Sequence, residues 1–226
     1  MMQTLQQHLP DLALAAALAW GAGLRLYLVM FGLGLAGRLG WFALPEHLEL
    51  MTSPLVLTAA GFMATVELFA DKLPWLDSLW DSMQTFIRIP AGAALAAAVF
   101  GDSSSAVAVA AALLGGSLTA ATHFSKAGAR AAANTSPEPF SNLALSFTED
   151  AAVVAGSWLA VQHPEVFLVL LAIFLVLIAV LMSWLIRGFR LRNGLLSAVL
   201  GALVYSVLSS LALGLLGLDV PVTMVK

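Results

Sequence analysis

The chain has no cysteine and little charge. Its 226 residues include 10 basic and 13 acidic side chains, which together make 10% of the sequence, whereas soluble domains typically carry about 25%. A chain this poor in charge cannot cover a water-facing surface. The lack of cysteine excludes disulfides, thiolate metal sites and cysteine nucleophiles. The formal net charge of −3 provides no basic surface, so we expect no nucleic-acid partner.

What the chain has instead is long apolar stretches, and 61% of its residues are hydrophobic. A helix needs about 20 apolar residues to cross about 30 Å of hydrocarbon, and several stretches approach or exceed that length. The alternating ten-residue segments of a membrane β-barrel are absent. The sequence therefore predicts an all-α, polytopic transmembrane bundle of six or seven spans. We expect them near residues 12–37, 53–72, 84–101, 105–126, 140–161, 165–187 and 194–217.

Nothing in the chain is polar enough for a separate soluble domain, so we expect one transmembrane domain over residues 1–226. The N-terminus lacks the positive region of a cleaved signal peptide, which makes 12–37 the first span. Glycines at 21–23 are a candidate break within it. Two stretches, "TFIRIPAGAALAAAVF" and "SFTEDAAVVAGSWLAV", align without gaps and suggest a weak repeat of units 53–101 and 105–161, with 165–217 as extra spans.

Orientation follows from the distribution of lysine and arginine, which favour cytoplasmic loops. Arg187, Arg190 and Arg192 cluster between the last two expected spans, so that loop should lie in the cytoplasm. Counting back predicts a multi-pass protein with a cytoplasmic N-terminus, and a hairpin in the first span would reverse only that end.

The segment "VELFADKLPWLDSLWDSMQTFIRIPAGA" is rich in charged residues, whereas most of the chain is apolar. Apolar residues recur at helical spacing on one face, and Asp77, Asp81, Gln84 and Arg88 recur on the opposite face. This pattern predicts an amphipathic helix near 74–88, interfacial or re-entrant. Its candidate interface residues are Trp75, Asp77, Trp80 and Asp81, because tryptophan anchors helices at membrane surfaces. For the two aspartates, an ordinary solvated surface helix is the alternative.

Other charges lie inside apolar spans. Glu149 and Asp150 occupy the middle of 140–161, and Arg25 the middle of 12–37. A charge at the centre of a membrane helix costs about 2.5–3.5 kcal/mol on insertion scales, so such groups pair or face a polar interior. A buried ion pair that fixes helix register is the alternative to a functional cavity. The candidate substrate or ion site comprises Arg25, Glu67, Asp71, Lys72, Arg88, His123, Lys126, Arg130, Glu149 and Asp150.

Patterns typical of catalysis and metal binding are missing. His123 has no second histidine four residues away, and no Ser-His dyad, His-x-Glu pair or Asp-rich diphosphate motif occurs. We therefore predict no catalytic residue, no metal and no cofactor. An intramembrane enzyme acting on lipid headgroups, with Asp77, Asp81 and His123 near the inner interface, remains an alternative.

Three long strings carry a resemblance to a known family. "GLRLYLVMFGLGLAGRLG", "ELFADKLPWLDSLWDSMQTFIRIPAGA" and "SKAGARAAANTSPEPFSNLALSFTED" resemble the bacterial membrane family catalogued as domain of unknown function 4126, over roughly residues 12–185. The resemblance implies a bacterial inner-membrane protein and no established activity. A looser similarity links Glu67, Asp71 and Lys72 to the Glu-x-Gly-Asp-Lys signature of cation exporters. Here the motif has an extra residue and no glycine, so we carry over no mechanism from those exporters.

The leading hypothesis is a small transporter or flippase whose charged site moves an ion, a small solute or an anionic lipid. Membrane lipids are the expected surroundings, and a homo-oligomer is compatible with the sequence. A non-catalytic membrane scaffold, in which the charges only order the helices, is the remaining alternative.

Overall fold

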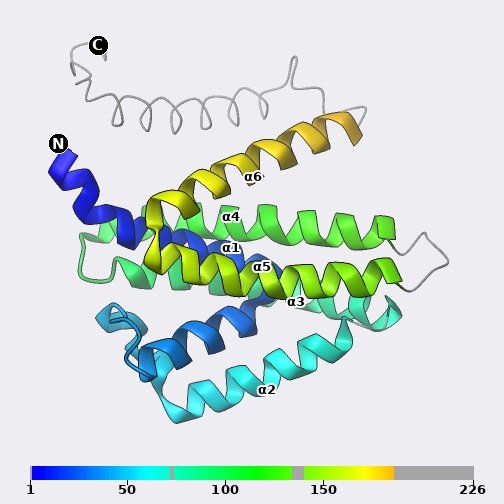
Figure 1. Cartoon of the computed structure of the whole chain (residues 1–226), viewed down its shortest axis with the longest axis horizontal. Coiled ribbons are helices and arrows are strands. Elements are labelled where there is room, and N and C mark those ends of the chain that lie inside the picture. The colour runs from blue at the N-terminus through cyan, green and yellow to red at the C-terminus, as the bar shows by residue number, and fades with distance from the viewer. Residues whose placement is uncertain (1, 72–73, 134–139, 186–226) are drawn as a thin grey trace. The chain divides into compact units, whose positions relative to one another are not determined.

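A computed structural model of the chain describes residues 2–71, 74–133 and 140–185, and all regular structure in them is helical (Figure 1). The all-α class predicted from the sequence is confirmed for this part of the chain. The elements are α1 (Met2–Arg38), the 3₁₀ helix η1 (Glu46–Thr52), α2 (Pro54–Ala70), α3 (Pro74–Val99), α4 (Ser105–Ala133), α5 (Phe140–Gln162) and α6 (Pro164–Leu185).

By length and composition alone, two of these helices are long and apolar enough to cross a membrane, over His8–Arg38 and Ser105–Arg130. A third crossing is available if η1 and α2, which meet at a bend of 67°, form one broken span. A membrane protein is thus supported, whereas a bundle of six or seven spans is not established. The expected span at 194–217 lies outside the described residues, and the internal repeat stays a prediction.

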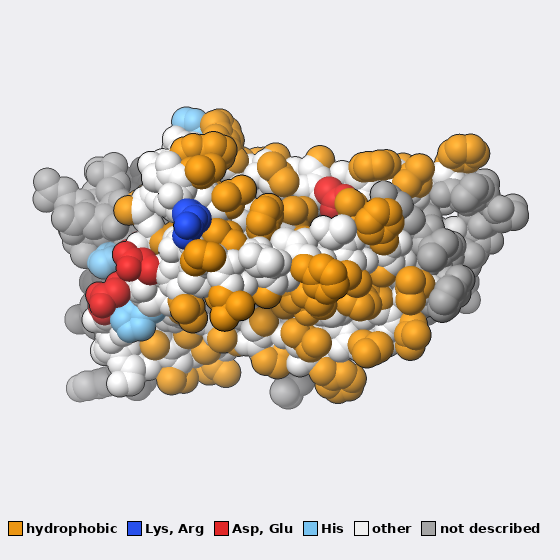
Figure 2. Space-filling model, turned by 90° about the horizontal axis from the view of Figure 1, so that it is seen from below, with side chains coloured by type: hydrophobic (Ala, Val, Ile, Leu, Met, Phe, Trp, Pro, Cys, Tyr) orange, Lys and Arg blue, Asp and Glu red, His pale blue; other side chains and the backbone are white. Residues whose placement is uncertain are grey.

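The distribution of side chains is the reverse of that in a soluble protein. Large apolar residues such as Leu55 and Phe86 are 80% and 83% exposed, while Glu67 and Arg88 are fully buried. The face in Figure 2 is mostly hydrophobic, and most of its charged side chains gather at one end. Soluble proteins bury apolar groups and rarely bury unpaired charge. The exposed apolar surface therefore suits contact with lipid.

The chain divides into two compact units, each of which is described separately. Residues 10–168 hold most of α1 together with η1 and α2 to α5, and this unit contains the candidate site. Its apolar core includes Leu18, Val29, Leu33 and Val153. The other unit includes residues 2–9 and the rest of α6 from Val169.

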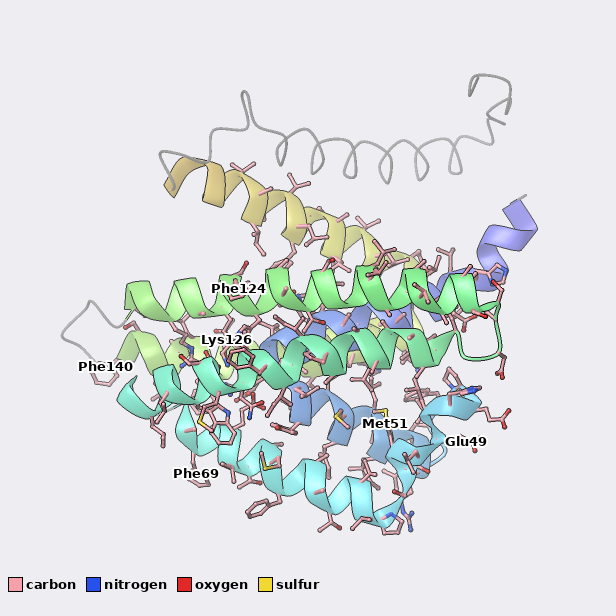
Figure 3. The ribbon with its side chains drawn as sticks, turned by 180° about the vertical axis from the view of Figure 1, so that it is seen from behind. Glu49, Met51, Phe69, Phe124, Lys126 and Phe140 are labelled. Atoms are coloured by element: carbon pink, nitrogen blue, oxygen red, sulfur yellow. The ribbon has the colours of Figure 1, made fainter. Side chains whose placement is uncertain are left out.

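Helix α1 is broken at Arg25, whose φ of −147° and ψ of 74° are not helical. Beyond the break, the second half of α1 runs back toward the end from which the first half came (Figures 1 and 3). A Cβ on Gly21 would lie 3.0 Å from Val29 Cγ2, an approach that a straight helix does not allow over eight residues. The glycines at 21–23 thus permit the bend predicted from the sequence, although the non-helical residue is Arg25.

Helices α3 and α4 pack through small residues. A Cβ added to Gly115 in α4 would collide with the Ala96 Cβ of α3, and one added to Gly92 would collide with Thr119. The Thr119 hydroxyl also donates to the carbonyl of Ala19 in α1 at 2.8 Å. Small residues let helix backbones approach closely, which is how helices associate in lipid. This packing brings the charged residues of α1, α3 and α4 to one place.

Substituting alanine at two glycines of α4 should have opposite effects. Gly128→Ala should raise the thermal midpoint, because a Cβ there meets nothing within 4 Å and alanine favours a helix by about 1 kcal/mol over glycine. Gly115→Ala gains the same propensity but forces α3 and α4 apart, and overpacking typically costs about 1–3 kcal/mol. Thermal unfolding in detergent, followed by tryptophan fluorescence, measures both. A midpoint that rises equally in both variants would contradict the α3–α4 contact.

Candidate functional site

The polar face of α3 points into the bundle. Asp81, Gln84 and Arg88 are all buried, while Met83 and Phe86 on the other face are exposed. The two faces predicted from the sequence are present, but the solvated surface helix that was the alternative for Asp81 is wrong. Pro90 lies inside the same helix, so the segment near 74–88 and the span expected at 84–101 form one continuous element. The side chains of Trp75 and Asp77 lie outside those the structure describes, and Trp80 is half-buried.

A first set of ion pairs surrounds Arg88. Its guanidinium pairs with Glu67 through Nη2 and with Asp81 through Nη1 at 3.0 Å. Glu67 and Arg88 are both fully buried, so neither charge is compensated by water. An isolated charge in such surroundings would be far more costly, which makes these pairs obligatory.

His123 of α4 extends this set. Arg88 Nη1 lies 3.2 Å from its Nδ1, and its Nε2 lies 2.7 Å from the Thr85 hydroxyl. Because arginine can only donate, Nδ1 is the acceptor, and Nε2 carries the hydrogen. That hydrogen is donated to Thr85, whose own hydroxyl donates to the Asp81 carbonyl at 3.0 Å. These contacts correspond to a neutral imidazole.

A second set of ion pairs surrounds Asp71, which caps the C-terminus of α2. A single oxygen, Oδ2, pairs with Arg25 Nη1, with Lys126 Nζ at 3.4 Å and with Arg130 Nη2 at 3.3 Å. Arg130 also donates to the Asp71 carbonyl at 3.1 Å. Three cations from α1 and α4 thus converge on one fully buried carboxylate.

The same three cations hold Glu149 of α5. Arg130 donates to it through Nε at 3.1 Å and Nη2 at 2.8 Å, a two-pronged contact. Arg25 Nη2 and Lys126 Nζ lie 3.4 and 3.6 Å from Glu149 Oε2. The neighbouring Asp150 pairs with Arg25 Nε at 2.8 Å. Arg25 Nη2 also donates to the Ser146 hydroxyl at 2.9 Å.

Lys126 connects the two sets, since its Nζ also lies 3.4 Å from Asp81. Figure 3 shows Lys126 among the helices. Its ammonium donates to the Leu24 carbonyl at 3.3 Å, a group at the break in α1. We call the combined set the charged network. It contains Arg25, Glu67, Asp71, Asp81, Arg88, His123, Lys126, Arg130, Glu149 and Asp150.

Nine of the ten residues predicted as a substrate or ion site lie in this network, and the tenth, Lys72, lies outside the described residues. The structure adds Asp81, which the sequence placed on an interfacial helix. Three polar residues of the site were not among the predicted site residues. Gln84 accepts a hydrogen bond from the Tyr27 hydroxyl at 3.3 Å, Thr85 contacts His123, and Ser146 contacts Arg25. The aligned stretches offered a signal, because Thr85 falls opposite Ser146 in them just as Arg88 falls opposite Glu149.

The network is arranged to hold charge by ion pairing. It has four basic side chains and five carboxyl groups, so with all of them charged and His123 neutral the network carries one excess negative charge. Among the residues that the structure describes, no group of three or more histidines and carboxylates is placed to hold a metal ion.

Removing one member of a buried pair should be far more harmful than removing an exposed arginine. Arg88→Met leaves Glu67 buried without its partner, and breaking such a pair typically costs about 3–5 kcal/mol. Adding Glu67→Gln should recover part of that loss, since Asp81 keeps Lys126 as a partner. Denaturation of the two single variants and the double variant in detergent measures the coupling.

The matched control is Arg38→Met, because Arg38 is exposed and donates only to the Thr52 carbonyl among the contacts described for it. Its effect should stay within about 0.5 kcal/mol. Equal losses for Arg88→Met and Arg38→Met would show that the Arg88 pairs are not formed in the protein.

Comparisons with known proteins identify a family and no activity. The searches of curated proteins and of solved structures each gave no significant match. Residues 12–184, which are most of the chain, match the family described as domain of unknown function (DUF4126), in agreement with the resemblance noted in the sequence. The protein therefore belongs to the family of domain of unknown function 4126.

Proposed function

We propose that this protein is a small membrane transporter and that the charged network is its substrate site. The cargo is a charged solute, an ion or an anionic lipid. One observation carries the proposal: charged side chains from all five helices α1 to α5 meet in the interior of a unit whose outer surface is apolar.

The number of buried charges favours a functional site over a set of ion pairs that only fixes the register of the helices. A single ion pair suffices to fix the register of two helices, and replacing such a pair with apolar residues is often neutral or stabilising. Here eight charged side chains are buried together, and a ninth, Asp150, keeps 23% of its side chain exposed. Ionisable residues inside membrane segments commonly mark substrate and ion pathways.

The break in α1 is a second support. Transporters often place their sites where a membrane helix is discontinuous, because the unwound backbone offers groups to the cargo. Arg25 lies at such a break, and the nearby Leu24 carbonyl contacts Lys126. Irregular backbone is tolerated at membrane depth only where protein or a polar cavity covers it.

One observation favours the scaffold alternative. Every charged side chain in the network has an opposite partner, as a purely structural assembly also requires. The two functions differ in what the charge is needed for. A scaffold requires the network only for folding, whereas a transporter requires it for turnover in a folded protein.

The proposal includes the surroundings of the protein. We propose that it lies in the bacterial inner membrane as a multi-pass bundle of six or seven spans. Membrane lipids are its immediate partners, and homo-oligomers are compatible with its apolar surface.

Transport in proteoliposomes tests the function. Glu149→Gln should abolish movement of the cargo while the protein elutes as folded, because the variant removes a charge that the three cations hold. The cargo panel is labelled phosphate, acetate, rubidium and a fluorescent phosphatidylglycerol. Glu49→Gln is the matched control, since Glu49 is exposed and lies at the opposite end of Figure 3 from Lys126. If the wild-type protein moves no cargo, or Glu149→Gln moves it normally, the proposal fails.

Accessibility tests the membrane setting. The chain has no cysteine, so a single introduced cysteine reports its own position. Phe86→Cys should resist a membrane-impermeant maleimide in vesicles, because this exposed side chain of α3 faces lipid in the proposal. Glu49→Cys should react from one side of the membrane. Rapid labelling at position 86 in intact vesicles would place this face in water.

A further inference from the structure

We infer that the cargo of the proposed transporter is an oxyanion, a phosphate or carboxylate group, and that Glu149 occupies the position the cargo takes. This inference rests on the proposed function and names its substrate class. It depends on the three cations Arg25, Lys126 and Arg130, which we call the cation triad.

The cation triad already binds two carboxylates. Asp71 Oδ2 and Glu149 Oε2 each contact all three cations, with separations to Lys126 and Arg130 between 2.8 and 3.6 Å. Such convergence of two guanidinium groups and an ammonium is the arrangement that recognises a phosphate or carboxylate.

The contact of Arg130 with Glu149 has the geometry of ligand recognition. Its Nε and Nη2 donate to the two different oxygens of the carboxylate at 3.1 and 2.8 Å. A guanidinium presents this fork equally well to a carboxylate or to two oxygens of a phosphate. The Glu149 side chain thus fills a position that an external oxyanion matches.

The two carboxylates differ in how firmly they are held. Asp71 is fully buried at the cap of α2, and Arg130 also binds its backbone carbonyl. Glu149 retains an exposed fraction of 10% in its side chain, and that of Asp150 beside it is 23%. The accessible side of the cation triad is therefore the α5 side, and Glu149 is the replaceable carboxylate.

Charge balance agrees with an exchange. When Glu149 leaves the triad, four cations of the network face four carboxylates instead of five. An incoming oxyanion then restores the charge that the bound Glu149 supplied. Returning Glu149 to the triad displaces the cargo, which gives this residue a role in release.

Binding and transport should respond oppositely to Glu149→Gln. The variant in detergent should bind inorganic phosphate or acetate about tenfold more tightly than the wild-type protein, because its triad lacks the competing carboxylate. It should nevertheless transport neither, since nothing charged displaces the anion. Calorimetric titration measures binding, and the proteoliposome assay measures turnover. Glu49→Gln, which makes the same change in net charge at an exposed position, should bind like the wild type.

Arg130→Lys is the second variant. It keeps the positive charge but loses the fork, so it should bind the anion at least about tenfold more weakly. If Glu149→Gln does not fold, anion binding by Arg130→Lys tests the inference on its own. Wild-type protein that binds none of the probes, or an Arg130→Lys variant that binds them as tightly as wild type, would overturn the inference.

The choice of probes distinguishes a free oxyanion in solution from an oxyanion carried on a lipid headgroup. Inorganic phosphate and acetate represent free solutes, and short-chain phosphatidylglycerol represents a lipid headgroup. Tight binding of either kind supports the oxyanion class and identifies its source. Anion binding without movement in vesicles would retain the cation triad as an oxyanion site and refute transport. Movement of rubidium alone would retain transport and refute the anion.

Discussion

The structure depends on one electrostatic constraint: charges withdrawn from water must be compensated by other charges. Moving an ion into an apolar interior costs several kcal/mol even after relaxation, so a buried ion requires partners of opposite sign. Asp71 and Glu149 satisfy three cations between them, and Glu67 satisfies Arg88. The helices that carry these groups are consequently fixed relative to one another by the network within residues 10–168.

Helix packing makes that network geometrically possible. Small residues along α3 and α4 allow close approach, and Gly21 allows Val29 to fold back beside it. As a result, the Arg25 side chain reaches acidic groups of both α2 and α5. A broken helix is expensive in lipid because it frees backbone groups, and Lys126 offsets part of that cost at Leu24. Fold and site are thus two aspects of the same set of contacts.

Ion pairs arranged in this way can be purely structural, or one of the carboxylates can be replaced by an external anion. The distinction lies in the difference between the carboxylates of the network, because Asp71 is fully enclosed and Glu149 is partly accessible. In our proposal, Glu149 is a built-in competitor for an external oxyanion at the three cations. Such competition permits release as well as binding, and a carrier needs both.

The sequence by itself determined the all-α class, the membrane character and nine of the ten residues of the charged network, because apolar length and misplaced charge are local properties. It also indicated the bend in α1 through its glycines. It could not determine that Asp81 faces inward, since an amphipathic pattern is the same whether its polar face meets water or protein. Nor could it determine which cation meets which acid. Those pairings were decided by the reversal of α1 at Arg25 and the close packing of α3 on α4, which depend on contacts between residues far apart in the chain.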